Sequence, residues 1–395
     1  MDKQFKDYNF KDFILEKLEE NHIITPTKIQ SETFLLTLKG KDVIGKAKTG
    51  TGKTLAYLLP MIEKIDPSKR ELQMLVLAPS RELSLQIKRE AELITKGTNI
   101  LVEAVVEGIK LEKQLEKLKK KPQLIVATPG KLVQIIGLKK IKMHNVKIIA
   151  LDEVDQILEQ GLRDKIFAVV NKTLKDRQLL SFSATISKEA KEILNKLMKE
   201  PVFVNLDHVE PIPSKIEHQY IITKKLKKTE TLVEILKNVK PKKSLIFINN
   251  NQNVDRFVKE LKSEGFSVGG IQTRTKNQER QHLLTSFNKG KLKILVTTDL
   301  FTRGMNFQEV SHIFNMDLPL NQTDYLHRAG RTGRMDREGV VINIIRDREK
   351  FILYKMMKSL NIKVIPIVIR NGKLIPVQEI INRKKVTNKN YDYKR

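Results

Sequence analysis

Short apolar runs rich in β-branched residues recur along the chain, with segments of helical periodicity between them. In the first half these runs cover residues 42–45, 74–79, 101–106, 124–129, 148–153, 179–185 and 202–206. In the second half they cover 220–223, 244–250, 266–271, 293–299, 312–318 and 339–345. Continuously apolar strands that alternate with helices are typical of parallel sheets covered on both faces. The pattern therefore predicts an α/β protein with two domains, each built on a mostly parallel sheet.

The two sets of strands are separated at residues 205–217, a stretch with prolines, mixed charge and no periodicity. Such a composition is typical of a linker. We predict a first domain over 1–206, a linker over 207–215 and a second domain over 216–364. Residues 365–395 hold two short strands joined by Asn371-Gly372, a dipeptide typical of hairpins, and then a short basic tail.

Composition supports two domains and indicates a polyanionic partner. A chain of 395 residues is longer than a domain with one ordinary hydrophobic core. Its 74 basic and 46 acidic residues give a formal net charge of +28. That excess predicts attraction to nucleic acid, although solvated lysine faces would produce the same count. The lysine-rich helix predicted at 110–121 is interpreted first as such a solvated face and second as a phosphate-binding patch.

The chain contains no cysteine, which excludes disulfides and thiolate metal sites and fits a reducing cytosol. The first residues, "MDKQFKDYNFKDF", lack the apolar segment of a secretory signal, and no stretch reaches the length of a membrane span. We expect a soluble, cytoplasmic protein without a membrane partner.

The segment "GKAKTGTGKT" lies between a predicted strand and a predicted helix. A glycine-bearing loop at a helix N-terminus directs backbone N–H groups and the helix dipole at a phosphate chain. Lys53 would reach the β and γ phosphates of ATP, and the Thr54 hydroxyl would bind Mg²⁺. The nucleotide-binding residues predicted in this loop are Ala47, Thr49, Gly50, Thr51, Gly52, Lys53 and Thr54.

A second strand, "IIAL", runs directly into Asp152, Glu153 and Asp155. Buried carboxylates need a cation, a donor or solvent. In proteins with such a phosphate loop, a strand-end Asp holds the same Mg²⁺, and Asp152 fits that role. Glu153 is predicted to be the general base that polarises the attacking water.

The order of the motifs resembles the DEAD-box RNA helicase family. The segment "DEVD" is followed by "SAT" at 183–185 and by "HRAGRTGR" at 327–334, and the resemblance extends from about residue 5 to residue 346. The family implies two tandem RecA-like domains, ATP with Mg²⁺ as cofactor, and RNA as partner, single-stranded or in short duplexes.

The resemblance also implies an adenine-binding segment at "HIITPTKIQ". Gln30 would be the amide that hydrogen-bonds the adenine edge, and Phe5 lies at the spacing of an aromatic residue that stacks on the base. An ordinary amphipathic-helix role stays open for Phe5, because Tyr8 and Phe10 are close by.

Several segments resemble the RNA-contacting motifs of the family. They bind phosphate and sugar through side chains and backbone N–H groups, so we expect little sequence preference. The residues predicted to contact RNA are Pro79, Arg81, Thr128, Gly130, Arg280 and Thr298.

Two arginines of "HRAGRTGR", Arg331 and Arg334, are three residues apart and can point the same way from a helix start or a tight turn. As arginine fingers they would neutralise charge on the γ-phosphoryl group, an effect of roughly 10³–10⁵ in rate. Because they lie in the second domain, the resemblance implies a site that is complete only when the domains close.

The "SAT" segment resembles the coupling motif of the family. Ser183 and Thr185 are expected to hydrogen-bond the region of Asp155 and His327. The tripeptide is informative only because it follows "DEVD" at the end of a strand.

Some family positions are altered. Val154 replaces the alanine of the family name, and Glu107 stands where the family has a glycine that approaches RNA. Asn306 replaces an aspartate but can still hydrogen-bond a ribose hydroxyl of the nucleotide. The second domain departs from the family pattern further than the first, so we expect a working ATPase with altered RNA binding or coupling.

Three interpretations stay open. The leading one is an ATP-dependent RNA helicase that closes around single-stranded RNA and locally unwinds short duplexes or remodels ribonucleoproteins. The second is an RNA clamp or annealing protein with weak or uncoupled ATPase, which Glu107 and Asn306 favour. The third is a DNA helicase or translocase. Ribosomal complexes, mRNA-decay complexes and cold-shock unwinding are all compatible settings.

Overall fold

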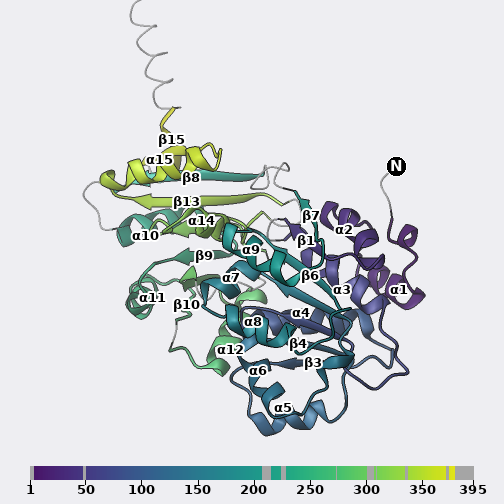
Figure 1. Cartoon of the computed structure of the whole chain (residues 1–395). Coiled ribbons are helices and arrows are strands. Elements are labelled where there is room, and N and C mark those ends of the chain that lie inside the picture. Colours follow the sequence, from purple (N-terminus) through teal and green to yellow (C-terminus); the bar gives the residue numbers. More distant parts are fainter. Residues whose placement is uncertain are drawn as a thin grey trace, which may run out of the picture. The chain divides into compact units, whose positions relative to one another are not determined.

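The computed structural model describes residues 4–47, 50–206, 215–223, 228–272, 274–299, 307, 309–333, 337–370 and 373–378. The chain folds into two compact units, Met1–Val209 and Glu210–Arg395. Each unit contains one sheet with helices, as Figure 1 shows for each taken by itself. The predicted α/β class, with a mostly parallel sheet in each half, is confirmed.

The strands of the first unit are β1 (Val43–Lys46), β2 (Met74–Leu77), β3 (Val102–Val105), β4 (Leu124–Ala127), β5 (Ile148–Asp152), β6 (Gln178–Ser183) and β7 (Val202–Asn205). Its helices are η1 (Phe5–Tyr8), α1 (Asp12–Glu20), α2 (Lys28–Leu38), α3 (Lys53–Glu63), α4 (Arg81–Thr95), α5 (Leu111–Leu118), α6 (Pro129–Gly137), η2 (Met143–Asn145), α7 (Val154–Glu159), α8 (Arg163–Val170) and α9 (Lys188–Leu197). Each of the seven strands overlaps a run predicted from the sequence.

The first sheet has the order β3-β4-β2-β5-β6-β1-β7, and all neighbouring pairs are parallel. Successive residues of one strand enter opposite cores: Met74 and Val76 of β2 pack in one apolar cluster, and Leu75 and Leu77 in another. The strands are apolar throughout because both faces of the sheet are covered.

Two helices of the first unit begin at a serine cap that follows a strand. Ser80 follows β2, and its hydroxyl accepts the backbone N–H of Leu83 at 3.2 Å to start α4. Ser187 starts α9 in the same way, accepting from Ala190 at 3.0 Å. Such caps satisfy N–H groups that have no intrahelical acceptor, and they keep the strand-to-helix loops short.

The strands of the second unit are β8 (Ile216–Ile222), β9 (Ser244–Phe247), β10 (Val268–Gly270), β11 (Ile294–Thr297), β12 (His312–Asn315), β13 (Gly339–Ile345), β14 (Ile365–Arg370) and β15 (Lys373–Pro376). Its helices are α10 (Lys228–Val239), η3 (Asn251–Asn253), α11 (Val254–Ser263), α12 (Asn277–Asn288), α14 (Gln322–Ala329), η4 (Asp347–Glu349) and α15 (Lys350–Ser359). The sheet order is β10-β11-β9-β12-β13-β8-β14-β15.

The C-terminal hairpin belongs to the second sheet. β14 and β15 pair antiparallel, as the hairpin prediction requires, with Arg370 opposite Lys373. β14 also pairs in parallel with β8, where Ile365 lies opposite Gln219. The sequence analysis set this hairpin apart from the second domain, whereas in the structure it extends the edge of that domain's sheet.

None of the helices in the described ranges is both long enough and apolar enough to cross a membrane.

Candidate functional site

Loops that carry the predicted site residues gather at the carboxyl edge of the first sheet, in two groups. β5, β6 and β1 are neighbours in the sheet, and they lead into the acidic cluster, the "SAT" segment and the phosphate loop. β3, β4 and β2 are also neighbours, and they lead into the segments at 107, 128–130 and 79–81. Ligands of open α/β sheets bind outside the carboxyl ends of the strands. The topology therefore separates the predicted nucleotide-binding residues from the predicted RNA-contacting residues along this edge.

The phosphate loop depends on glycine where it meets α3. Gly50 and Gly52 have φ of 91° and 86°, in the left-handed region that glycine adopts without strain. A Cβ at position 52 would lie 2.4 Å from Nε2 of Gln30, so a side chain would clash there. α3 begins directly after this glycine, and its N-terminus faces the loop, as anion binding requires.

The Lys53 ammonium lies between a backbone carbonyl and a carboxylate. Its Nζ donates to the carbonyl of Ala47 at 2.8 Å and forms an ion pair with Oε1 of Glu153 at 3.3 Å. Both side chains of the ion pair are buried. The cation and the predicted general base are therefore held together at the end of the sheet.

Glu153 is fixed from its other side by the "SAT" segment. Its Oε2 accepts from the Ser183 hydroxyl at 3.2 Å and from the backbone N–H of Ala184 at 3.4 Å. Its backbone has φ of 50°, which is uncommon for a residue with a side chain. This conformation changes the direction of the backbone between β5 and α7 and directs the Glu153 carboxylate toward Lys53.

Asp152, the last residue of β5, accepts a hydrogen bond from the buried hydroxyl of Tyr57 at 2.9 Å. Burial, and then the neighbouring Glu153 carboxylate, raise the pKa of Asp152 to about 7. Lys53 and the Tyr57 hydroxyl act in the opposite direction because they favour the ionised form. Asp152 is thus a carboxylate whose charge is only partly offset by the protein.

This donor set suits Mg²⁺. The Thr54 side chain hydrogen-bonds Tyr57 and Glu90, and Tyr57 in turn contacts the Asp152 carboxylate. Hydroxyl and carboxylate oxygens are ligands that Mg²⁺ prefers, and nearby divalent charge would favour ionisation of Asp152. Among the described residues no group of three or more His, Cys, Asp or Glu side chains could hold a metal. A site of this kind takes its remaining ligands from phosphate groups and water.

Asp155 lies in the first turn of α7 and binds the end of the "SAT" segment. Its Oδ2 accepts from the Thr185 hydroxyl at 2.6 Å, and its Oδ1 accepts from the backbone N–H of Ser187 at 3.1 Å. Burial raises the pKa of Asp155, while these two donors act against the rise. Of the two "SAT" side chains expected near Asp155, Thr185 contacts it, whereas Ser183 contacts Glu153 instead.

Gln30 joins the adenine-binding segment to the phosphate loop. It is 2% exposed, its carbonyl oxygen accepts from the backbone of Thr27 at 2.9 Å, and its amide nitrogen donates to the carbonyl of Gly52 at 3.0 Å. A primary amide has two donors and two acceptor positions, so one of each is left for a ligand. A ligand that binds Gln30 would therefore contact a side chain that is hydrogen-bonded to Gly52, the residue before α3.

Phe5 lies in η1 and is 4% exposed. Its ring centroid is 6.1 Å from that of Phe34, which also contacts Tyr8 and Phe10 at 5.0 and 5.1 Å. These contacts place Phe5 in an aromatic core cluster, so its stacking on a base stays a prediction.

The first RNA-contacting segment follows β2. Pro79 is buried, and Arg81 is the first residue of α4. The Arg81 atom Nη1 is buried and has no hydrogen-bond partner within the described ranges. A guanidinium nitrogen in that state is a donor available to a phosphate oxygen.

The second RNA-contacting segment follows β4 and leads into α6. Thr128 is buried next to Gly130, and the Thr128 hydroxyl donates to Oε2 of Glu107 at 2.6 Å. A Cβ at Gly130 would lie 3.5 Å from the other carboxylate oxygen of Glu107. The residue that departs from the family pattern is thus in direct contact with the segment predicted to bind RNA.

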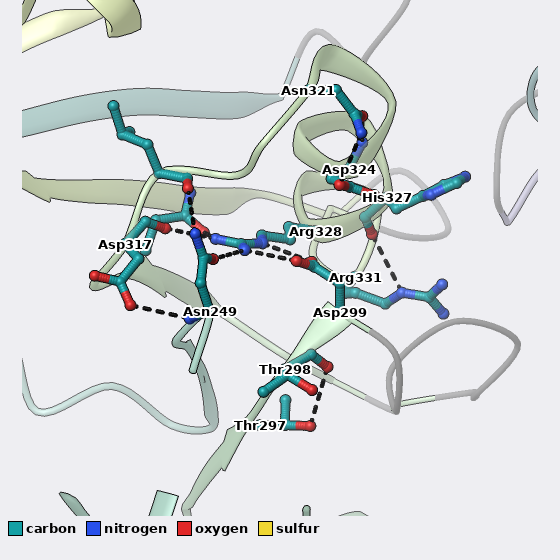
Figure 2. A network of polar contacts seen from close by, with 12 residues as sticks. Asn249, Thr297, Thr298, Asp299, Asp317, Asn321, Asp324, His327, Arg328 and Arg331 are labelled. Carbon is teal, nitrogen blue, oxygen red and sulfur yellow. Dashed lines mark hydrogen bonds and ion pairs between the residues drawn. The ribbon is translucent and has the colours of Figure 1, made fainter. Parts of the chain in front are cut away.

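In the second unit, the "HRAGRTGR" segment is anchored by Arg328, whose side chain is 1% exposed (Figure 2). It forms two hydrogen bonds of 2.6 Å with the Asp299 carboxylate. It also donates to Asn249 at 2.7 Å, to Asn315 at 3.1 Å and to the carbonyl of Asp317 at 2.7 Å. Such a bidentate, fully hydrogen-bonded guanidinium fixes the direction of the helix that carries it.

Arg331 follows the end of α14 at Ala329 and lies in a turn, not at a helix start. Its backbone N–H donates to the carbonyl of Arg328 at 3.0 Å, and its Nε donates to the carbonyl of His327 at 3.2 Å (Figure 2). Both Arg331 and His327 are buried.

The remaining predicted residues of the second unit are Arg280, in α12, and Thr298, just after β11. Arg280 donates to the carbonyl of Thr275 at 3.4 Å, and Thr298 is buried beside Thr297. Three further predicted site residues lie outside the described residues: Thr49, Asn306 and Arg334.

Sequence reasoning missed Tyr57 and Arg328. Tyr57 lies within an apolar stretch of α3, where an aromatic residue is expected to be core, and nothing local indicates that its hydroxyl meets Asp152. Arg328 does carry a signal, since it lies inside the "HRAGRTGR" segment, but of the three arginines there the sequence analysis singles out only Arg331 and Arg334.

Two family descriptions match the sequence. Residues 27–193 match the family described as DEAD/DEAH box helicase. Residues 227–336 match the helicase conserved C-terminal domain.

Two curated Bacillus proteins are similar over most of their length. The chain is 38% identical to the DEAD-box ATP-dependent RNA helicase CshC of Bacillus cereus, over 85% of this chain and 86% of that protein. It is 35% identical to the probable ATP-dependent RNA helicase YfmL of Bacillus subtilis, over 93% of this chain and 97% of that protein.

A solved structure, S. cerevisiae Dbp5 bound to RNA and ADP BeF3, is similar with a TM-score of 0.84 and 29% identity. The likeness covers 98% of this chain and 99% of that chain. It confirms the prediction of two tandem RecA-like domains.

Proposed function

The chain belongs to the DEAD-box family of ATP-dependent RNA helicases, and from this premise we propose that it uses ATP to unwind short RNA duplexes locally. The observation that carries the proposal is the convergence of Lys53, Asp152 and Glu153 at one edge of the first sheet. A cation, a metal-binding carboxylate and a general base in one place are the parts that phosphoryl transfer to water requires.

Lys53 and the N-terminus of α3 bind the ATP phosphates in this proposal. The ammonium is already held at the loop by the Ala47 carbonyl, so little reorganisation is needed to receive a phosphate oxygen. Gln30 reads the adenine edge with the donor and acceptor that Thr27 and Gly52 leave available.

Thr54 and Asp152 would hold Mg²⁺, which when bound bridges phosphate oxygens and neutralises part of their charge. Glu153 accepts the proton of the attacking water at its carboxylate. Ser183, the Ala184 N–H and Lys53 fix the orientation of that carboxylate before the reaction begins.

Arg331 and Arg334 are assigned to the γ-phosphoryl group as arginine fingers. What supports the assignment of Arg331 is its anchoring next to the Arg328–Asp299 pair, which fixes the end of α14 from which it extends. An arginine so fixed loses little side-chain entropy when it meets a phosphate.

RNA is bound by the edge formed after β2 and β4. The buried Nη1 of Arg81 is available to a phosphate oxygen, and Thr128 and Gly130 lie at the start of α6, where N–H groups favour an anion. Arg280 and Thr298 extend these contacts in the second unit. Contacts of this kind do not read bases, so little sequence preference is expected.

The test is ATP hydrolysis by the full chain with and without a single-stranded RNA of mixed sequence, at one low salt concentration, because phosphate contacts are salt-sensitive. A DNA strand of the same sequence is the matched control. Strong stimulation by RNA and weak stimulation by DNA support the proposal. Equal stimulation by DNA would favour a DNA translocase.

A second candidate is an RNA clamp or annealing protein with uncoupled ATPase. The contact of Glu107 with Thr128 favours it, because a carboxylate lies where an RNA phosphate is expected. If RNA binds but the rate of ATP hydrolysis stays at its RNA-free value, this second candidate is favoured.

A further inference from the structure

Glu107 is an exposed acid that is nevertheless held in one place. Its Oε2 accepts a hydrogen bond of 2.6 Å from the hydroxyl of Thr128, which is itself buried. This length is typical of a hydroxyl that donates to a charged acceptor, and such hydrogen bonds are stronger than those between neutral groups. The carboxylate is therefore a fixed feature of the edge after β4.

The sheet register determines this contact. In the parallel pair of β3 and β4, Val105 lies opposite Ala127, and the backbone N–H of Thr128 donates to the carbonyl of Val105 at 3.1 Å. Glu107 follows the end of one strand by two residues and Thr128 follows the other by one. The two side chains meet because their strands end side by side.

The second oxygen of Glu107 faces the first turn of α6. A Cβ on Gly130 would be only 3.5 Å from Oε1, so the carboxylate closely approaches that glycine. The first helical N–H to bond back within α6 is that of Leu132, to the carbonyl of Thr128 at 3.0 Å. The N–H groups before it have no acceptor inside the helix, and the helix dipole favours an anion beside them.

Everything that favours the Glu107 carboxylate at this position also favours an RNA phosphate: a hydroxyl donor, a glycine without a side chain and the start of a helix. Two anions cannot share these donors, and their mutual repulsion adds to the competition. We propose that Glu107 is an internal competitor for the RNA phosphate at Thr128 and Gly130, which bound RNA must displace. This inference rests on the proposed function, since it assumes that these two residues bind RNA.

The consequence is a lowered RNA affinity set by one side chain. RNA that is bound elsewhere, for example at Arg81, must displace the carboxylate before a phosphate can occupy this position. Glu107 is thus a residue that determines affinity for the nucleic-acid substrate, not a residue of ATP hydrolysis.

The experiment compares Glu107→Gln, which removes only the charge, with Glu107→Gly, which clears the position. Glu112→Gln, an exposed acid in the first turn of α5, is the matched control for loss of one negative charge. Binding of a fluorescein-labelled single-stranded RNA to the full chain, with a non-hydrolysable ATP analogue, is followed by anisotropy. Thermal unfolding of each variant checks that the fold is kept.

We expect Glu107→Gln to tighten RNA binding by about 3- to 10-fold, from removal of one close like charge, and Glu107→Gly to tighten it at least as much. Glu112→Gln should change it by less than about 2-fold, since exposed charges at a distance are screened. In a Thr128→Val background the gain from Glu107→Gln should shrink, because the contested hydroxyl is gone.

Variants of Glu107 that bind RNA like the control, or more weakly than wild type, overturn the inference. If wild type binds RNA and the variants merely follow the control, this inference fails and the proposed function stands. If neither wild type nor any variant binds RNA, both fail.

Discussion

The buried hydroxyl of Tyr57 donates a hydrogen bond of 2.9 Å to Oδ2 of Asp152, the carboxylate assigned to Mg²⁺. Burial raises the pKa of Tyr57 well above its ordinary range, so this hydroxyl stays a donor at every physiological pH. A donor to a carboxylate favours the ionised form and fixes its orientation. Tyr57 therefore counteracts the burial that raises the pKa of Asp152 to about 7.

Tyr57→Phe should raise the Mg²⁺ concentration needed for half-maximal ATP hydrolysis. The ring, whose centroid lies 5.6 Å from that of Phe182, still fills its place, and only the donor is lost. A hydrogen bond to a charged group contributes ~1.5–3 kcal/mol, so a shift of about 10- to 100-fold is expected. Tyr220→Phe, which removes a hydroxyl paired with Tyr354 in the second unit, is the control. A Mg²⁺ titration identical to wild type would contradict the role given to Tyr57.

Glu153→Gln should stop turnover while ATP and RNA still bind. Glutamine keeps an oxygen for the Ser183 hydroxyl but cannot accept the proton of water, so a loss of about 10²–10⁴ in rate is expected. Glu189→Gln, at an exposed position in α9, is the matched control. The measurement is steady-state ATP hydrolysis together with unwinding of a short RNA duplex. Duplex remodelling that survives the substitution would favour the clamp or annealing protein.

Arg328→Lys should destabilise the second unit. Lysine cannot reproduce the two bonds to Asp299 together with those to Asn249 and Asn315, and it removes the bidentate contact of a partly buried carboxylate. Breaking a fully buried pair costs about 3–5 kcal/mol of unfolding free energy, and the partial exposure of Asp299 puts the expected loss at the lower end of that range. Urea unfolding followed by circular dichroism measures the loss.

The control for that experiment is Arg337→Lys, because Arg337 is exposed and pairs with Glu309 at 3.2 Å. Exposed pairs contribute about 0–1 kcal/mol, so this variant should unfold close to wild type. Equal effects of the two substitutions would show that the Arg328 network does not stabilise the unit.

The strands were predictable because their signal is local. The run at 339–345 coincides with β13, and continuous apolar character predicted that both faces of the sheet are covered. β8 was longer than predicted: it begins at Ile216, and its first half alternates buried and exposed residues around a buried His218. A buried histidine beside the prolines of the linker conceals a strand, because its burial depends on neighbours that are distant in sequence.

The sequence singles out the candidate site residues, but it does not predict which of them pair. The motifs identify Lys53, Asp152 and Glu153, and the strand order, which no local pattern specifies, brings them together. Contacts such as Tyr57 with Asp152 join residues 95 positions apart. The addition of β14 to the edge beside β8 likewise depends on tertiary packing that the hairpin signal does not contain.

His218 should make the second unit less stable in mild acid. Its Nδ1 lies 2.8 Å from the Tyr325 hydroxyl, and burial lowers its pKa from 6.5 to about 4. Its Nε2 is buried without a hydrogen-bond partner among the described residues, so a proton there would find no acceptor. Above pH 6.5 the imidazole is neutral in both states and makes no pH-dependent contribution.

Below pH 6.5 the unfolded chain binds a proton that the folded chain excludes until about pH 4, so stability falls through this interval. Between pH 7.5 and pH 5 the loss from this group is about 2 kcal/mol. His218→Gln removes the titrating group. Between pH 7.5 and pH 5 the unfolding free energy of this variant should therefore fall by about 2 kcal/mol less than that of wild type. His144→Gln, at an exposed position in η2, should follow wild type. If the unfolding free energies of wild type and His218→Gln depend on pH in the same way, the fold does not prevent protonation of the imidazole.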